Sequence, residues 1–114
     1  MTNNVTADAI CKFLSDKKAQ DIVKIYVADK TIIADYFVIA SGRSTPQVKS
    51  LCEYLEAFIE ENGGEVRRKE GVQEGRWAVV DTGDIIIHIF NDEQRLFYHL
   101  ERIWGDGEKF EDNE

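Results

Sequence analysis

His88 is the residue with the clearest potential for chemistry, because it stands between Ile87 and Ile89 in an otherwise apolar segment. A histidine can serve as a general base, but that role needs a Ser or Cys nucleophile or a second metal ligand at a suitable position. The sequence places no such partner at a recognisable spacing. We therefore favour a packed or hydrogen-bonded histidine, and we predict neither a catalytic residue nor a metal site.

The turn Ser41-Gly42-Arg43-Ser44 is a second candidate, because it joins a predicted strand to a predicted helix. Such a turn can bind an anion at the helix N-terminus. Nucleotidyltransferases follow a turn of this kind with two metal-binding carboxylates on the next strand. Here the acids that follow, such as Glu53 and Glu56, lie inside the helix. A nucleotide-binding enzyme that uses this turn is therefore an alternative function, and we predict no cofactor.

Charge favours a protein partner over nucleic acid. The chain has 114 residues with 22 acids and 14 bases, which gives a formal net charge of −8. A nucleic-acid binder needs a basic surface, so we expect no direct nucleic-acid binding as the main source of affinity. An acidic protein suits a basic protein as its partner. Residues 106–114 are expected to form an acidic, disordered tail after a single domain at 1–105.

Several classes of protein are disfavoured by composition. No apolar run approaches the roughly 18 residues of a membrane helix, so no membrane partner is expected. The N-terminus has no basic start followed by an apolar stretch, so it does not resemble a secretory signal. Cys11 and Cys52 have no metal-site spacing and are expected to be reduced, buried thiols. We therefore expect a cytoplasmic protein.

Hydrophobic periodicity predicts elements in the order α-β-β-α-β-β-β-α. The helices are expected at 6–18, from the Ser44 cap to Gly63-Gly64, and from about 91 to 104. The strands are expected at 21–27, 35–40 and 65–69, with a hairpin within 76–90. The predicted fold is α/β: a mixed five-stranded sheet with three helices on one face.

The hairpin places a set of aromatic and charged side chains on one face. A turn at Thr82-Gly83 would pair Asp81 with Asp84 and Trp77 with His88. Because three helices cannot cover five strands on both sides, we expect this face to be open and to bind a partner. Asp81 and Asp84 either cap a solvated turn or await a basic partner. The face carries Trp77, Val79, Asp81, Asp84, Ile86, His88 and Phe90.

A series of separated motifs resembles the family of ribosomal silencing factors (RsfS, also called Iojap-like) over about residues 6–104. One departure is Thr82, where the family usually has an aromatic residue. The motifs are Ala34-Asp35-Tyr36-Phe37-Val38-Ile39-Ala40-Ser41-Gly42, Ser44 with Gln47, Glu74-Gly75-Arg76-Trp77, Asp81-x-Gly83-Asp84, His88-Ile89-Phe90, and Arg95-x-Phe97-Tyr98-x-Leu100-Glu101-x-x-Trp104.

The resemblance implies a ribosome-binding protein that is not an enzyme. It implies a fold related to nucleotidyltransferases but without their catalytic carboxylates. It also implies binding to the large ribosomal subunit through ribosomal protein uL fourteen, which blocks association with the small subunit and represses translation when nutrients are limiting. The resemblance further implies that the chain can form a homodimer off the ribosome. An assembly or adaptor factor without repression is the alternative. The expected partner-binding residues are Trp77, Asp81, Asp84, His88, Phe90, Arg95 and Tyr98.

Overall fold

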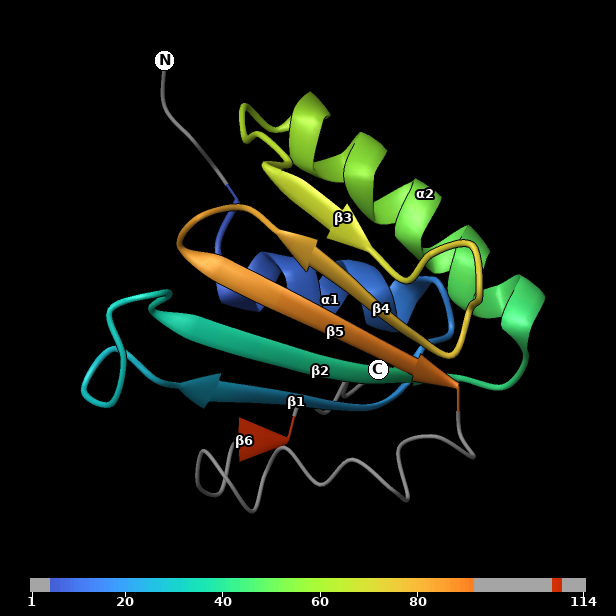
Figure 1. Ribbon diagram of the computed structural model, residues 1–114, viewed down its shortest axis with the longest axis horizontal. Coiled ribbons are helices and arrows are strands. Elements are labelled where there is room, and N and C mark those ends of the chain that lie inside the picture. The colour runs from blue at the N-terminus through green and yellow to red at the C-terminus, as the bar shows by residue number, and fades with distance from the viewer. Residues whose placement is uncertain (1–4, 92–107, 110–114) are drawn as a thin grey trace.

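The computed structural model describes residues 5–91 and 108–109, which form a mixed sheet with two helices (Figure 1). The third expected helix lies outside these residues. None of the helices in the described part of the chain is long and apolar enough to cross a membrane. The elements are α1 (Ala7–Asp16), β1 (Gln20–Tyr26), β2 (Tyr36–Gly42), α2 (Thr45–Glu61), β3 (Arg68–Glu70), β4 (Trp77–Asp81), β5 (Ile85–Asn91) and β6 (Glu108–Lys109).

The sheet has the strand order β3-β4-β5-β2-β1-β6. The central strands β2 and β5 run parallel, with Tyr36 opposite Ile85 and Gly42 opposite Asn91. All other neighbours are antiparallel. The mixed sheet is therefore confirmed, and the solidly apolar segment at 35–40 does form a central strand that is buried on both faces.

Local capping sets the helix limits. The Thr6 hydroxyl accepts a hydrogen bond from the Ala9 N–H at 3.0 Å, and Ser44 does the same for Gln47 at 3.2 Å. Helix α2 ends in a Schellman motif, in which the Gly64 N–H donates to the Ile59 carbonyl at 2.8 Å. Gly63 has a φ of 88°, a left-handed conformation that glycine adopts without strain.

Both helices cover the same face of the sheet (Figure 1) and build the first core with it. Cys11 and Cys52 lie in this core as buried free thiols, as expected. Burial raises the pKa of each thiol to about 11, because the apolar surroundings disfavour the charged thiolate. The largest fully buried side chains of this core are Ile10, Leu14, Leu51, Leu55, Ile59, Ile87 and Ile89.

The opposite face of the sheet is a second core, so the expectation of an open face is wrong. Phe90 is completely buried, and only 8% of His88 is exposed. Counting helices misled the prediction, because the side chains of this face are as well buried as those of the first core. The members of this second core are Val23, Ile25, Val27, Ala34, Phe37, Ile39, Ile86 and Phe90, with Trp77 and Val79 packed against them.

The hairpin register also differs from the expected one. Trp77 lies opposite Phe90, and Asp81 lies opposite Ile86. The connection is therefore longer than the predicted two-residue turn. Because the register differs by two positions, every side chain stays on the face that alternation predicts.

Strand β6 pairs with β1, with Lys109 opposite Val23 and Glu108 opposite Lys24. These two residues fall within the segment 106–114 that was expected to be disordered, so the expectation is corrected for them. This pairing gives backbone N–H and C=O groups of β1 hydrogen-bond partners in β6. Without β6 these groups would bond to water.

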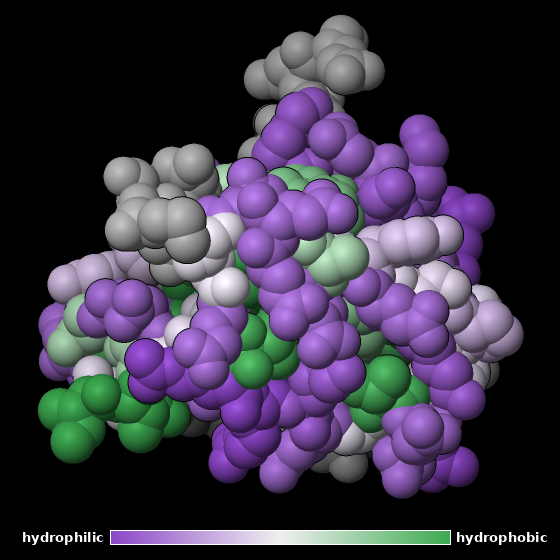
Figure 2. All heavy atoms as spheres, turned by 90° about the horizontal axis from the view of Figure 1, so that it is seen from above, coloured by the Kyte–Doolittle hydropathy of each residue, from purple (hydrophilic) through white to green (hydrophobic). Residues whose placement is uncertain are grey.

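The described surface exposes few large hydrophobic side chains: Tyr26, Ile32, Ile33 and Tyr54. Seen from above, hydrophilic side chains dominate the molecule (Figure 2). Hydrophobic side chains project at the left edge of that view, the end of the molecule where the β1–β2 connection lies.

Candidate partner-binding surface

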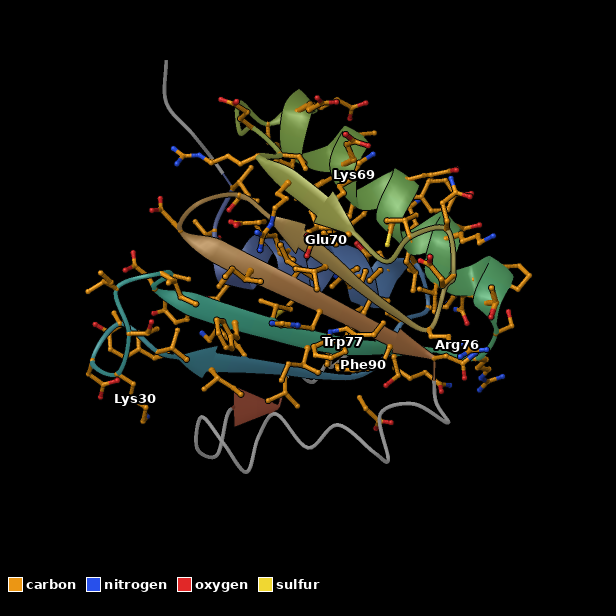
Figure 3. The ribbon with its side chains drawn as sticks, in the orientation of Figure 1. Lys30, Lys69, Glu70, Arg76, Trp77 and Phe90 are labelled. Atoms are coloured by element: carbon orange, nitrogen blue, oxygen red, sulfur yellow. The ribbon has the colours of Figure 1, made fainter. Side chains whose placement is uncertain are left out.

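Trp77 begins β4 and lies close to Phe90 of β5 (Figure 3). Its indole stacks on Phe90 with 5.1 Å between ring centroids. Its Nε1–H donates a hydrogen bond to Nδ1 of His88 at 3.1 Å. The Phe37 ring meets the His88 ring edge-on at 5.1 Å. These contacts fix the orientation of a partly exposed tryptophan from beneath.

His88 is neutral and structural in this arrangement. Because Nδ1 accepts a hydrogen bond, the ring proton belongs on Nε2. Nε2 has no hydrogen-bond partner in the described part of the chain. Burial lowers the pKa of His88 from 6.5 to about 4, since the charged form loses its hydration. The favoured interpretation of His88 as a packed, hydrogen-bonded histidine is confirmed.

Asp81 and Asp84 flank the turn between β4 and β5, and their side chains have different surroundings. The Asp81 carboxylate accepts a hydrogen bond from the Gly83 N–H at 2.7 Å, so Asp81 caps the turn. The Asp84 side chain is exposed. Its backbone carbonyl accepts hydrogen bonds from the N–H groups of Asp35 and Tyr36, at 2.8 and 3.2 Å. Because Asp81 lies opposite Ile86, the two aspartates are not directly opposed as the sequence predicted.

The predicted partner-binding residues do not form one compact site. Trp77 and Asp81 stand at opposite ends of β4 and are partly exposed, whereas His88 and Phe90 are buried. The last two therefore support Trp77 in this structure and do not face solvent. Arg95 and Tyr98 lie outside the described residues.

Two exposed residues were missed by sequence reasoning, Ile32 and Ile33 in the β1–β2 connection. They formed no periodic pattern, and the segment between the two predicted strands was therefore given no role. The available signal was a pair of large aliphatic residues between Thr31 and Ala34, in a segment that belongs to no strand.

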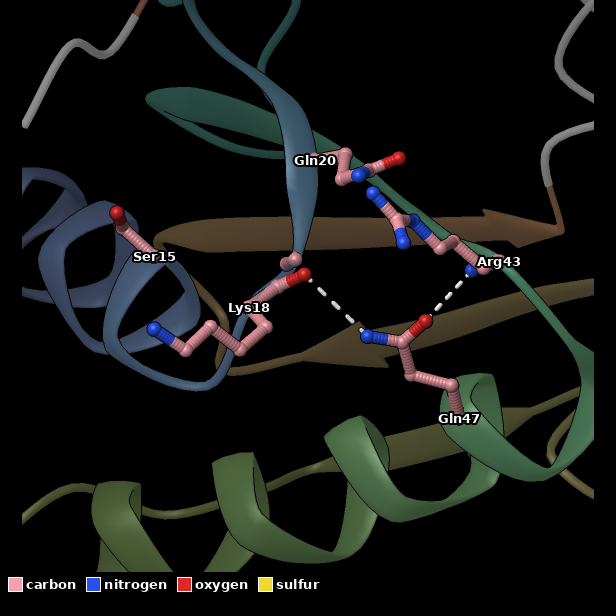
Figure 4. A pocket seen from close by; sticks show the side chains of 6 residues that line it. Ser15, Lys18, Gln20, Arg43 and Gln47 are labelled. Carbon is pink, nitrogen blue, oxygen red and sulfur yellow. Dashed lines mark hydrogen bonds between the residues drawn. The ribbon is translucent and has the colours of Figure 1, made fainter.

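A pocket of about 410 Å³ lies where the end of α1 meets the start of α2 (Figure 4). The Gln47 side chain bridges it: Oε1 accepts from the Arg43 N–H at 2.6 Å, and Nε2 donates to the Lys18 carbonyl at 3.3 Å. With its amide oxygen turned toward Arg43, Gln20 accepts from guanidinium Nε at 2.8 Å. The polar groups around the Ser41–Ser44 turn are thus largely bonded to one another.

The described residues offer no group of side chains that could bind a metal ion. In residues 5–91, no cluster of three or more His, Cys, Asp or Glu side chains is placed to hold a metal ion. The acids Glu53 and Glu56 lie on α2, as expected, and not on a strand beside the turn.

Comparison with known proteins gives a consistent family. The family model of ribosomal silencing factors during starvation, RsfS, matches residues 1–114. The ribosomal silencing factor RsfS of Zymomonas mobilis is 47% identical over 96 residues, which are 84% of this chain and 72% of that protein. A solved structure from Chromobacterium violaceum has a TM-score of 0.81 at 28% identity, covering 96% of this chain and 95% of that one.

A more distant relative carries a different name. The mouse protein named mitochondrial assembly of ribosomal large subunit protein 1 is 32% identical over 100 residues. These residues are 85% of this chain and 44% of the mouse protein.

Proposed function

Because the chain belongs to the family of ribosomal silencing factors, we propose that it binds the large ribosomal subunit through ribosomal protein uL fourteen. Bound there, it blocks association with the small subunit and represses translation under nutrient limitation. It acts in the cytoplasm as a binding protein and not as an enzyme. Off the ribosome, homodimers are the proposed resting form.

The observation that carries this proposal is the presence of accessible family-motif residues on the β4–β5 hairpin. Trp77 is partly exposed and held rigidly by Phe90 and His88. Asp84 is exposed at the turn, where it offers a negative charge. A rigid aromatic side chain and a complementary charge are typical components of a protein–protein interface. The net charge of −8 favours a basic partner such as a ribosomal protein.

The remaining predicted residues have secondary roles in the proposal. His88 and Phe90 position Trp77 from below, and Asp81 shapes the turn that presents Asp84. Arg95 and Tyr98 extend the surface. A distant relation to nucleotidyltransferases without their catalytic carboxylates belongs to the proposal as well.

An assembly or adaptor factor that does not repress translation is the second candidate. The name of the mouse relative, which refers to assembly of the large ribosomal subunit, favours it. The third candidate, a nucleotide-binding enzyme at the Ser41–Ser44 turn, has less support because N–H groups that could hold an anion there already have partners. The Arg43 N–H donates to the Gln47 side chain, and the Gln47 N–H donates to the Ser44 hydroxyl.

Co-sedimentation and subunit joining distinguish these candidates. Purified chain is mixed with large subunits, and small subunits are then added at a magnesium concentration that favours joining. Silencing predicts that the chain travels with large subunits and lowers the amount of joined ribosome. An assembly factor predicts co-sedimentation with normal joining. Absence of co-sedimentation contradicts both.

A further inference from the structure

The connection between β1 and β2 carries an unusual apolar tip, defined as Ile32 and Ile33. Ile32 is fully exposed, and 57% of Ile33 is exposed. Figure 2 shows hydrophobic side chains projecting from this end of the molecule. Large aliphatic side chains that gather at one exposed place commonly mark an interaction site.

The tip is held out by an ordered loop. At its base the Val27 N–H donates to the Asp35 carbonyl at 2.8 Å. The Val27 carbonyl accepts from the N–H groups of Lys30 and Thr31, at 2.9 and 3.0 Å. Val27 and Ala34 are buried in the second core and anchor both ends of the loop. The two isoleucines therefore project from a closed loop.

Carboxylate residues lie at the base of the loop that carries the tip. The Asp84 carbonyl accepts from the Asp35 N–H, so the β4–β5 turn lies directly against the base of the loop. Asp35 and Asp84 are both exposed, whereas Asp29 is paired with Lys30 at 3.8 Å. The labelled Lys30 marks this same end of the sheet in Figure 3.

Basic groups offset only part of this charge. Besides Lys30, the Arg67 guanidinium lies close to Gly83 in the β4–β5 turn. Asp35 and Asp84 thus leave this end of the sheet with exposed negative charge beside exposed aliphatic surface.

We propose that the apolar tip, together with Asp35 and Asp84, docks on a basic protein surface that has an apolar recess. This inference rests on the proposed function, in which that surface belongs to the ribosomal protein. It extends the binding surface from the hairpin to the β1–β2 loop. Carboxylates next to the tip repel the phosphates of RNA and of anionic lipid headgroups. In a two-fold homodimer the same acidic patch would face itself, which disfavours a second copy as the occupant.

The experiment substitutes both isoleucines and measures binding to purified large subunits. The variant Ile32→Thr/Ile33→Thr keeps β-branched side chains but removes most of the apolar contact. We expect an unchanged melting temperature, because neither side chain is buried, and a loss of affinity of roughly tenfold or more. Tyr54→Ser is the matched control, since it removes an exposed hydrophobic side chain from α2, and it should bind like the original chain.

The outcomes separate the two proposals. If the original chain does not bind large subunits, the proposed function fails. If the original chain binds and the double variant binds equally well, the docking role of the tip is overturned while the proposed function stands. If the double variant binds normally but loses self-association in sedimentation equilibrium, the occupant is a second copy and the inference is likewise overturned.

Discussion

The indole N–H of Trp77 donates a hydrogen bond to Nδ1 of His88 at 3.1 Å, between adjacent strands of the sheet. This bond links a partly exposed residue of a family motif to a buried ring whose pKa is lowered to about 4. The same two side chains therefore connect the stability of the second core with the shape of the proposed binding surface.

The pH dependence of stability should reveal His88. Its pKa is lower in the folded state than in the unfolded state, where it is near 6.5. Between these pH values the unfolded chain binds a proton at His88 that the folded chain does not bind. The free energy of unfolding is therefore unreduced by His88 above pH 6.5 and falls as the pH is lowered toward 4. The full lowering of the pKa corresponds to a loss of roughly 3 kcal/mol in the free energy of unfolding.

The matched variant is His88→Phe, which cannot titrate but keeps an aromatic ring between Phe37 and Phe90. Urea unfolding of both proteins at pH 7 and pH 4.5 isolates the histidine from the carboxylates. The free energy of unfolding of the original chain should fall by about 2 kcal/mol more than that of the variant. Parallel pH curves would contradict the buried, neutral histidine.

Trp77→Phe tests the hydrogen bond itself. A phenyl ring still stacks on Phe90 but donates nothing to His88. We expect a loss of about 1–2 kcal/mol in the free energy of unfolding, the usual cost of leaving a buried acceptor unpaired. A double-mutant cycle with His88→Phe should give a coupling energy near 1 kcal/mol, whereas additive losses would show that the bond has no energetic role.

Gly71→Ala tests how the loop before β4 positions Trp77. Gly71 has a φ of 75°, and a Cβ at this position would collide with the Trp77 carbonyl oxygen. Gly63→Ala is the comparison, because Gly63 ends α2 with a similar left-handed φ of 88°. In both variants an alanine must adopt the left-handed backbone conformation, which costs about 1–2 kcal/mol. Gly71→Ala should lose clearly more stability in urea unfolding, and equal losses would refute the close approach.

Asp84→Lys tests the charge of the proposed interface. The Asp84 side chain is exposed, and its structural hydrogen bonds come from the backbone carbonyl, which the substitution keeps. The melting temperature should stay the same, while affinity for large subunits should fall roughly tenfold and more steeply at low salt. Glu53→Lys on α2 makes the same change in net charge at another exposed place. An equal loss in both variants would indicate a general charge effect.

Much of the fold was predictable, because hydrophobic periodicity and caps are local signals. Ser44 caps its helix as predicted, and the 35–40 segment is a buried central strand. The hairpin register was wrong because the turn at Thr82-Gly83 is longer than the residues alone suggest. The Asp81 carboxylate closes it by bonding to the Gly83 N–H, a tertiary detail that spacing does not encode.

The candidate site was less predictable, because burial of the second face depends on tertiary packing. The alternation of side chains placed Trp77, His88 and Phe90 together correctly. It gave no information on whether that face is covered, and Phe90 proves to be fully buried. The exposure of Ile32 and Ile33 also follows from loop closure at Val27, which no periodic pattern reveals.

We propose that this chain silences ribosomes by holding the large subunit apart from the small one. The most direct test is a sucrose gradient of purified subunits under joining conditions, with increasing amounts of the chain. The account predicts that the peak of joined ribosomes declines as the chain accumulates in the large-subunit peak. A joined-ribosome peak that stays constant while the chain saturates the large subunits would contradict it.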